Sequence, residues 1–326
     1  MKTLAVLTVR NEGAFLLEWL AHHKAAGFTD FLVFSNDCDD GTDRMLDRLA
    51  ELGWLTHVPN PGPWEEGPQW SALKLADKHP ALKTAEWVMV IDMDEFVNIK
   101  IGDKTLSALT DSFPDCDAFP MTWRMFGNAG VTDFEDLPVT EVFTRAAPRI
   151  LHWPWRALMV KTLFRRDVFR KLGVHRPKGE KRPARWFDPN LGQRLFSAPG
   201  SDHYSVMQLN HYALGAMESY IVKCDRGRAN RSASAFDMSY WCDRNFADEE
   251  DTSLQELNSS TIRQDLLADP VLQTLHQDSV IWRKARFAEL MQEEPWRALF
   301  GRLMMTPPAR ILAPAEAQRI RQYRRD

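Results

Sequence analysis

Three acidic side chains stand together at the end of a short apolar run. Asp92, Asp94 and Glu95 follow Trp87–Ile91, whose five successive apolar residues are typical of a strand buried on both faces. Two carboxylates separated by one residue can both reach a hard divalent cation that also holds phosphate oxygens. The segment therefore predicts a metal or phosphate role. The alternative is that the acids merely end a strand in solvent.

One other enzyme class uses the same pair of carboxylates. In haloacid-dehalogenase-like phosphatases a strand ends in D-x-D-x-[T/V], where the first Asp is the nucleophile and the second is a general acid. Here the fifth position is Phe96, and the pair follows the fourth expected strand rather than the first. Both departures weaken the phosphatase interpretation, which stays open.

The first hundred residues alternate apolar runs with amphipathic stretches. Strands are expected at Thr3–Val9, Phe31–Phe34, Trp54–Val58 and Trp87–Ile91, with helices between them. Strands that alternate with helices indicate a parallel sheet covered by helices on both faces. The ligand site of such a sheet lies at the carboxyl ends of its strands, so the loops that follow these strands are expected to meet there.

The pattern changes after residue 100. Strands are expected at Asp117–Phe126, Leu158–Arg166 and Ser205–Asn210, and ten Lys or Arg between residues 161 and 185 suggest an exposed basic loop. Helical periodicity is found at Leu254–Leu267, Val280–Met291, Trp296–Met304 and Ala315–Tyr323. We expect an α/β core at residues 1–235 and a helical C-terminal region at residues 236–326.

Composition narrows the class of protein. The 326 residues are 44% hydrophobic and 26% charged, which is the balance of a folded protein, and a net charge of −4 does not favour a nucleic-acid partner. The four cysteines form no C-x-x-C pair and fit free thiols in a reducing cytoplasm. The longest apolar run falls far short of the ~20 residues that span a bilayer. Thr3–Val9 is interpreted as a strand rather than a signal peptide.

A series of short segments carries a resemblance to a known family. In chain order they are Thr8–Glu12, Glu18-Trp19, Ser35–Thr42, Asp92–Phe96, Trp123–Gly127, Val160-Lys161, Val174-His175, Asn210–Tyr212 and Lys223–Gly227. Over residues 3–230 the chain resembles nucleotide-sugar-dependent glycosyltransferases of the GT-A fold, closest to the family-2-like and family-92-like groups. The resemblance implies a mixed, Rossmann-like sheet flanked by helices. The helical end of the chain matches nothing comparable.

The resemblance also implies a metal-assisted transfer. Asp92 and Asp94 would hold a cation that neutralises the departing diphosphate, and His211 would be a further ligand. Carboxylates with an imidazole suit Mn²⁺, with Mg²⁺ as the alternative. The structural alternative for His211 is a core histidine bonded to the backbone.

Nucleotide recognition is expected in the loops that follow the first two strands. By family analogy the base and ribose would be bound by Arg10, Asn11, Glu12, Asn36 and Asp40, and the nucleotide would also be contacted by Lys74, Asp92 and Met93. Ser35 stands where relatives often carry Asp. Asp40 has a rival structural role as a helix cap.

Diphosphate or acceptor contacts are expected from Lys161, Lys223, Arg226, Trp123 and His175. Lys223 and Arg226 would share one face if Ser219–Arg228 is helical, and Trp123 would form a wall of the acceptor site. A general base must reach the acceptor hydroxyl. Glu95 and Asp136 are both conceivable, and the sequence does not decide between them.

The resulting hypothesis is an inverting transfer of a hexose from a nucleotide diphosphate sugar, with UDP favoured, to a glycan or lipid-linked acceptor. Inversion is favoured by the family-92 likeness only. The alternatives are a D-x-D phosphohydrolase and a carbohydrate-binding protein without activity. The expected location is cytoplasmic, with peripheral contact to the inner face of the membrane through the basic stretch or the Arg-rich tail Ala315–Arg325.

Overall fold

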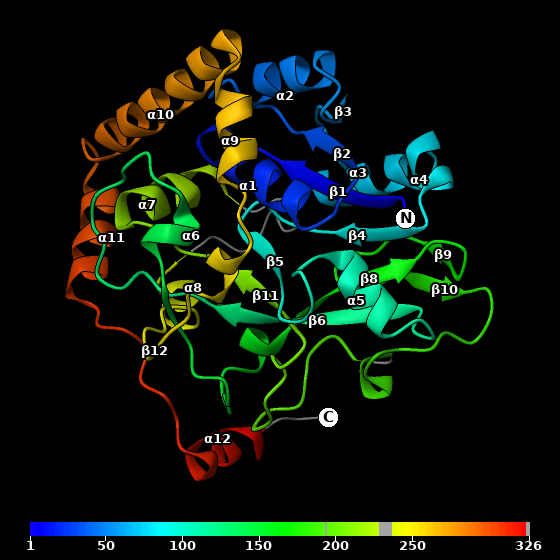
Figure 1. Ribbon diagram of the computed structural model, residues 1–326. Coiled ribbons are helices and arrows are strands. Elements are labelled where there is room, and N and C mark those ends of the chain that lie inside the picture. Colours follow the sequence, from blue (N-terminus) through cyan, green and yellow to red (C-terminus); the bar gives the residue numbers. More distant parts are fainter. Residues whose placement is uncertain (193, 228–236, 324–326) are drawn as a thin grey trace.

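An eight-stranded sheet forms the centre of the molecule (Figure 1). The computed structural model describes residues 1–192, 194–227 and 237–323. The strands lie in the order β3-β2-β1-β4-β8-β6-β11-β5. Their bounds are β1 Thr3–Val9, β2 Asp30–Ser35, β3 Thr56–Pro59, β4 Trp87–Val90, β5 Glu95–Ile99, β6 Ala118–Met125, β8 Val160–Arg165 and β11 Met207–His211.

The first four strands along the chain are parallel, as the sequence predicts. β1 pairs with β2 and with β4, and β2 pairs with β3, all in the parallel sense. These strands coincide with the expected ones to within two residues at either end. The residues just after β1, β2 and β4 therefore meet at one edge of the sheet, which is where Asn11, Asn36 and Asp92 lie.

The remaining strands make the sheet mixed, which confirms the fold class implied by the family resemblance. β8 is antiparallel to both β4 and β6, whereas β11 is parallel to β6 and antiparallel to β5. No expected strand corresponds to β5, which begins at Glu95 immediately after the acidic turn. Because β5 pairs with β11, His211 is placed opposite Glu95.

Two groups of helices cover the two faces of the sheet. Their bounds are α1 Gly13–Ala25, α2 Thr42–Glu51, α3 Pro68–Ala76, α4 Pro80–Thr84 and α5 Leu106–Ser112. Side chains of a strand alternate between faces, and in β1 Leu4 and Val6 join the apolar cluster of α3 and α4. Ala5 and Leu7 join the larger cluster that includes α1, α2 and α5. The flanking helices expected from the periodicity are therefore present.

The helical C-terminal region is also confirmed. Its helices are α8 Met238–Cys242, α9 Ser260–Leu267, α10 Pro270–Leu290, α11 Glu294–Met305 and α12 Pro314–Arg321. α9 contacts α1, while α10 contacts α1, α2 and α7 (Met217–Arg226) (Figure 1). The expected boundary at residue 235 lies outside the described residues. None of the described helices combines the length and apolar character needed to cross a membrane.

Helix α10 begins at Pro270 rather than at Val280, where the periodicity places its start. The Asp269 side chain caps it by accepting from the Leu272 backbone N–H at 2.9 Å. Proline is well tolerated in the first helical turn because that turn has no intrahelical partner for its N–H groups. The additional turns bring α10 against the first turn of α1.

The expectation of an exposed basic loop at residues 161–185 is wrong in part. Residues 161–165 belong to β8, and Lys161 is fully buried. The Arg182 guanidinium binds both oxygens of the buried Asp117 at 2.8 Å. What remains is the hairpin of β9 (Phe169–Lys171) and β10 (Lys178–Glu180), whose exposed cations include Arg170, Lys171, Lys178 and Lys181.

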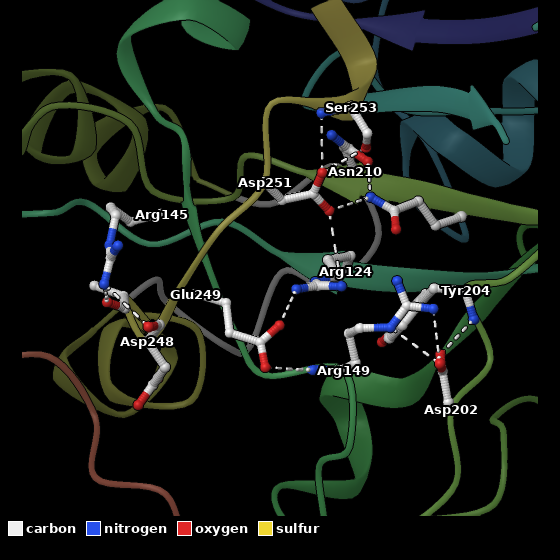
Figure 2. Close-up of polar contacts among 12 residues, drawn as sticks. Arg124, Arg145, Arg149, Asp202, Tyr204, Asn210, Asp248, Glu249, Asp251 and Ser253 are labelled. Atoms are coloured by element: carbon white, nitrogen blue, oxygen red, sulfur yellow. Dashed lines mark hydrogen bonds and ion pairs between the residues drawn. The ribbon is translucent and has the colours of Figure 1, made fainter.

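A partly buried polar network fastens the segment around residue 250 to the sheet (Figure 2). Arg124 of β6 donates to Glu249 at 2.7 Å, and Asp251 accepts from Gln208 of β11 at 3.0 Å. Although burial would raise it, hydrogen bonds from Ser253 and Gln208 lower the pKa of Asp251 to about 2. Successive residues of a strand point to opposite faces, so this network supports β6 and β11 from the face opposite the site described next.

Candidate active site

Asp92 is held by two side chains from other elements. Its Oδ2 accepts from Lys161 Nζ at 2.9 Å, and its Oδ1 accepts from Gln69 Nε2 at 3.1 Å. Lys161 projects from β8 and also lies 3.5 Å from Glu95. Burial disfavours the ammonium form, but the two carboxylates raise the pKa of Lys161. The lysine therefore stays charged inside the protein.

Glu95 is fully buried next to the Asp92 turn. Its Oε2 accepts from the Asp92 backbone N–H at 2.8 Å, and its Oε1 accepts from Trp123 Nε1 at 2.7 Å. Burial raises the pKa of Glu95 to about 8, against the opposing charge of Lys161. With both oxygens engaged, Glu95 is arranged to orient the acidic turn and the indole ring rather than to meet a ligand.

Asp94 faces a different set of partners. Its Oδ2 lies 2.7 Å from Lys223 Nζ of α7 and 3.6 Å from His211 Nε2 at the end of β11. Burial would raise the pKa of Asp94, but the Lys223 ammonium holds it well below its usual range. Burial also lowers the pKa of His211, so the imidazole is neutral at pH 7. Asp94 is thus an ionised carboxylate between a cation and a neutral imidazole.

Trp123 packs between the two histidines predicted for the site. The centroid of its ring lies 4.3 Å from that of His211 and 5.6 Å from that of His175. His175 Nδ1 lies 3.0 Å from the Val160 carbonyl oxygen. Burial, reinforced by the Lys161 charge, lowers the pKa of His175 to about 4. Both imidazoles are therefore uncharged and fixed around the indole.

The two predicted cations of α7 lie on one face of that helix, as their spacing predicts. Lys223 reaches Asp94, and Arg226 bonds to Glu12 and to the Arg10 carbonyl oxygen, the latter at 3.0 Å. α7 joins the acidic turn after β4 to the loop after β1. Residue 228, the expected end of this helix, lies outside the described residues.

The loops after β1 and β2 are tied to each other. Asn11 has a φ of 53°, a conformation that asparagine adopts more readily than most residues. Its amide exchanges two hydrogen bonds with Asp39, at 3.2 and 2.7 Å. Asn36 is buried, donates to the Val9 carbonyl oxygen and accepts from Asn60. Both asparagine amides thus shape the loops that the sequence assigns to the nucleotide.

Asp40 makes structural contacts as well. Its carboxylate accepts from the Gly13 backbone N–H at 3.0 Å and from the Thr42 backbone N–H at 2.9 Å. It therefore joins the first turns of α1 and α2, a structural role, although Gly41 rather than Asp40 stands at the N-cap of α2. Arg10, by contrast, keeps 41% of its side chain exposed. Asp92 and Asp94 keep 35% and 26% exposed, so a ligand can reach both.

Two predicted residues have their partners away from the acidic turn. Lys74 on α3 is exposed and pairs with Glu66 at 2.9 Å. Asp136 pairs with His276 of α10 at 2.9 Å. The neighbours of Asp136 in the chain line a cavity beside Asp94, whereas its own carboxylate is engaged with the C-terminal region.

Three residues that sequence reasoning does not single out complete the site: Gln69, Trp19 and Arg283. Trp19 Nε1 donates to the carbonyl oxygens of Asp92 and Glu95, both at 3.1 Å, and so fixes the acidic turn. Arg283 of α10 donates to the Asn11 carbonyl oxygen at 2.9 Å. Trp19 belongs to one of the resembling segments and could have been identified. Arg283 reaches the site only through the packing of α10.

The expected metal ligands are brought together in part. Within residues 1–192, 194–227 and 237–323, no three or more His, Cys, Asp or Glu side chains gather closely enough to hold a metal ion. Asp94 and His211 lie side by side, whereas the Asp92 carboxylate is turned toward Lys161. A carboxylate oxygen and a neutral imidazole nitrogen suit Mn²⁺. These two residues fit a cation, provided that Lys223 gives way at Asp94.

A cavity of about 360 Å³ lies beside this cluster. Its charged lining includes Glu12, Asp94, Lys223 and Arg283, and Met93, predicted at the nucleotide, is also in its wall. The rest of the lining comes mainly from residues 131–143 and from the loop at residues 212–216. The site thus consists of a charged cluster with a predominantly apolar chamber next to it.

Residues 6–226 match glycosyltransferase family 92, which is more than half of the chain. The chain belongs to glycosyltransferase family 92. The matched range contains the acidic turn, Lys161, His211 and both cations of α7. Helix α10, which supplies Arg283, lies beyond it. The charged cluster therefore lies within the residues that match the family, whereas Arg283 beside it is supplied by a helix beyond that range.

Similarity to known members of the family is partial. A family 92 protein of Oryza sativa subsp. japonica is 26% identical over 140 residues, which are 42% of this chain and 23% of that protein. A family 92 protein of Ricinus communis is 31% identical over 99 residues, which are 29% of this chain and 16% of that protein. The chain thus matches less than a quarter of the length of either relative.

Similarity to solved structures is lower. S. aureus TarS 1–349 in complex with UDP is 18% identical, with 52% of this chain and 48% of that chain covered and a TM-score of 0.32. HddC from Yersinia pseudotuberculosis is 10% identical, with 57% and 88% covered and a TM-score of 0.32.

Proposed function

We propose that the chain transfers a hexose, with inversion, from a nucleotide diphosphate sugar to a glycan or lipid-linked acceptor, and that the donor is a UDP-hexose. One observation carries the proposal. In a family 92 chain, Asp92 and Asp94 meet the ammonium groups of Lys161 and Lys223 at the carboxyl end of β4. A departing diphosphate needs cations around it, and this is where the charged side chains converge.

Lys223 and Arg226 are proposed to receive the diphosphate. In the structure both are paired with acids, Lys223 with Asp94 and Arg226 with Glu12. A phosphate oxygen offers the same kind of charge-assisted hydrogen bond as a carboxylate oxygen. Either cation can therefore exchange one anion for the other without remaining buried and unpaired. The fully buried Lys161 is less free to move and is proposed to hold Asp92 in place.

Mn²⁺ or Mg²⁺ is proposed as the cofactor, held by Asp94 and His211 with Asp92 as a third ligand. When bound, the cation would offset the negative charge that develops on the leaving diphosphate. The protein contributes an ionised carboxylate at Asp94 and a neutral imidazole at His211. Contact with the Trp123 ring keeps that imidazole in place.

The base that accepts the proton of the acceptor hydroxyl must reach it by a hydrogen bond. Glu95 is buried with both oxygens engaged, and Asp136 is paired with His276. Asp133 and Glu135 are exposed at the cavity that also contains Asp94. We therefore propose one of these two carboxylates as the base and a positioning role for Glu95.

A cytoplasmic location at the inner face of a membrane is part of the same proposal. Its support is the exposed basic hairpin of β9 and β10, which carries cations on a protein of net charge −4. Anionic lipid surfaces attract such clusters at low salt.

The direct test is release of UDP from UDP-hexoses in the presence of Mn²⁺. Asp94→Asn keeps the shape of the side chain but removes its charge, and it should lower turnover on the order of 10²-fold, the cost of losing one group that stabilises developing charge. Asp111→Asn, an exposed acid on α5, is the matched control and should retain turnover.

Equal turnover by the two variants would contradict the proposed site. Phosphate released from phosphomonoesters without any nucleotide would instead favour a D-x-D phosphohydrolase. Saccharide binding without turnover under all donor conditions would favour a carbohydrate-binding protein.

A further inference from the structure

The cavity beside Asp94 is walled by apolar side chains that come from several parts of the chain. It has a volume of about 360 Å³. Its apolar lining includes Phe15, Met93, Phe134, Phe143, Tyr212 and Leu214. These residues come from α1, the acidic turn, the segment at residues 131–143 and the loop after β11. A chamber of this kind beside a charged cluster is typical of a ligand site with one apolar and one polar part.

The wall at residues 131–143 is held in place by hydrogen bonds. The buried Glu18 carboxylate of α1 accepts from the backbone N–H of Val139 at 2.9 Å and from that of Thr140 at 3.0 Å. Glu218 of α7 accepts from the Phe134 backbone N–H at 2.8 Å. Val139 and Thr140 begin the short helix α6, Val139–Val142. This wall of the cavity is therefore anchored by hydrogen bonds to α1 and α7.

Helix α10 closes another part of the chamber. The Arg283 guanidinium lies 4.6 Å from the centre of the Phe15 ring and 5.8 Å from that of Phe134. It is also hydrogen-bonded to the Asn11 carbonyl oxygen at 2.9 Å. Because α10 lies beyond the range that matches family 92, this part of the chamber is built by residues outside the family's common region.

The charges at the entrance of the chamber do not favour an anionic aglycone. Of the two cations in the lining, Lys223 belongs to the proposed diphosphate site, and Arg283 faces Glu12 at 3.7 Å. Toward solvent the lining consists of exposed Asp133, Glu135 and Leu137. An apolar group without charge can pass this acidic entrance, whereas a phosphate would meet like charges in it.

We propose that this chamber binds an uncharged apolar aglycone of the acceptor, with the acceptor's sugar directed toward Asp94. The inference rests on the proposed glycosyl transfer and narrows its acceptor to a glycoside of an alkyl or aryl alcohol. Burial of each methylene group is expected to tighten binding about fourfold, for as long as the added carbons enter the chamber.

The test measures binding by calorimetry, with the full chain and no donor. The probes are methyl, butyl and hexyl β-glucoside, with hexyl phosphate as the anionic comparison. We expect the dissociation constant to fall with each added methylene and hexyl phosphate to bind more weakly than hexyl glucoside. Equal affinity of the three glucosides, or tighter binding of hexyl phosphate, would overturn the proposal.

Two variants place the binding in this chamber. Leu137→Asp puts a charge at the entrance, where 52% of the leucine is exposed, and Val142→Trp fills the chamber with an apolar ring. Ile150→Asp is the matched control because Ile150 is 50% exposed and is not part of the lining. We expect both chamber variants to weaken hexyl glucoside binding at least about tenfold and to flatten the dependence on chain length. Ile150→Asp should keep the wild-type affinity for hexyl glucoside and its dependence on chain length.

A chain-length dependence that survives in both chamber variants would overturn the assignment to this chamber. UDP binding, measured separately, distinguishes this inference from the proposed function. If UDP binds and is released from UDP-hexoses but the glucosides show no chain-length dependence, the aglycone site is wrong and the transferase proposal is not. If the glucosides behave as expected but UDP does not bind, the chamber binds apolar aglycones and the proposed use of a UDP-hexose donor is wrong.

Discussion

Glu18 is the residue through which the apolar chamber should be most readily disturbed without touching its lining. The carboxylate is almost completely buried on α1 and accepts three hydrogen bonds. Oε2 accepts from the Val139 backbone N–H at 2.9 Å, and Oε1 accepts from the backbone N–H and the hydroxyl of Thr140 at 3.0 and 2.8 Å. All three partners are donors. Glu18→Gln has the same shape but replaces one acceptor oxygen with a donor NH₂ group.

The size of the effect follows from this mismatch. Whichever way the amide turns, its NH₂ group faces at least one N–H that had an acceptor before. A buried donor left without an acceptor costs about 1–3 kcal/mol. Because all three donors belong to Val139 and Thr140, we expect the cost to appear as local opening of the segment at residues 131–143. At RT of about 0.59 kcal/mol, opening should become about 5- to 150-fold more frequent.

Hydrogen exchange followed by mass spectrometry measures this opening directly. We expect peptides that cover residues 131–143 to exchange about 5- to 150-fold faster in Glu18→Gln, while peptides from β1 and β4 stay unchanged. Glu51→Gln on α2 is the control, because Glu51 is exposed and its partner among the described residues is the partly exposed Arg48 on its own helix. If residues 131–143 exchange at the same rate in both variants, Glu18 does not anchor the chamber wall and the reasoning is refuted.

Three further predictions concern charge. His211→Ala should raise the Mn²⁺ concentration needed for half-maximal UDP release about 10- to 100-fold, the usual cost of weakening a metal site, and an unchanged Mn²⁺ activation curve would return His211 to a structural role. Because burial raises the pKa of Glu95 to about 8, its contribution to stability is complete below its unfolded value of 4.5 and is lost as the pH rises through 8. Glu95→Gln should therefore gain stability relative to the wild type between pH 5 and 8, by up to about 1.4 kcal/mol per pH unit in urea denaturation, whereas a pH-independent difference would contradict the assignment. The double variant Lys171→Glu/Lys181→Glu should weaken co-sedimentation with anionic vesicles at least about tenfold at low salt, whereas the control Lys284→Glu on α10 should leave it unchanged. Equal effects of the double variant and the control would show that the hairpin is an ordinary solvated surface. Arg182 is not changed because it neutralises the buried Asp117.

The sequence by itself determined the parallel half of the sheet and the position of the acidic turn. β1 and β4 are recognisable because uninterrupted apolar runs, Leu4–Leu7 and Trp87–Ile91, are typical of strands buried on both faces. The acids that follow β4 must then lie at the carboxyl edge, beside the loop after β1. The pairing of Lys223 and Arg226 on one face was also predictable, because helical spacing is a local property.

Only the tertiary structure decided which charges meet. Lys161 appears in the sequence within a basic stretch, yet the register of β8 between β4 and β6 buries it against Asp92. Glu95 is one of three neighbouring acids in the sequence, and β5 turns it alone into the interior. Arg283 follows Asn11 by more than 270 residues and reaches it because α10 packs on α1. Burial and pairing of charges depend on strand register and helix packing over such separations, and these have no local signal in the chain.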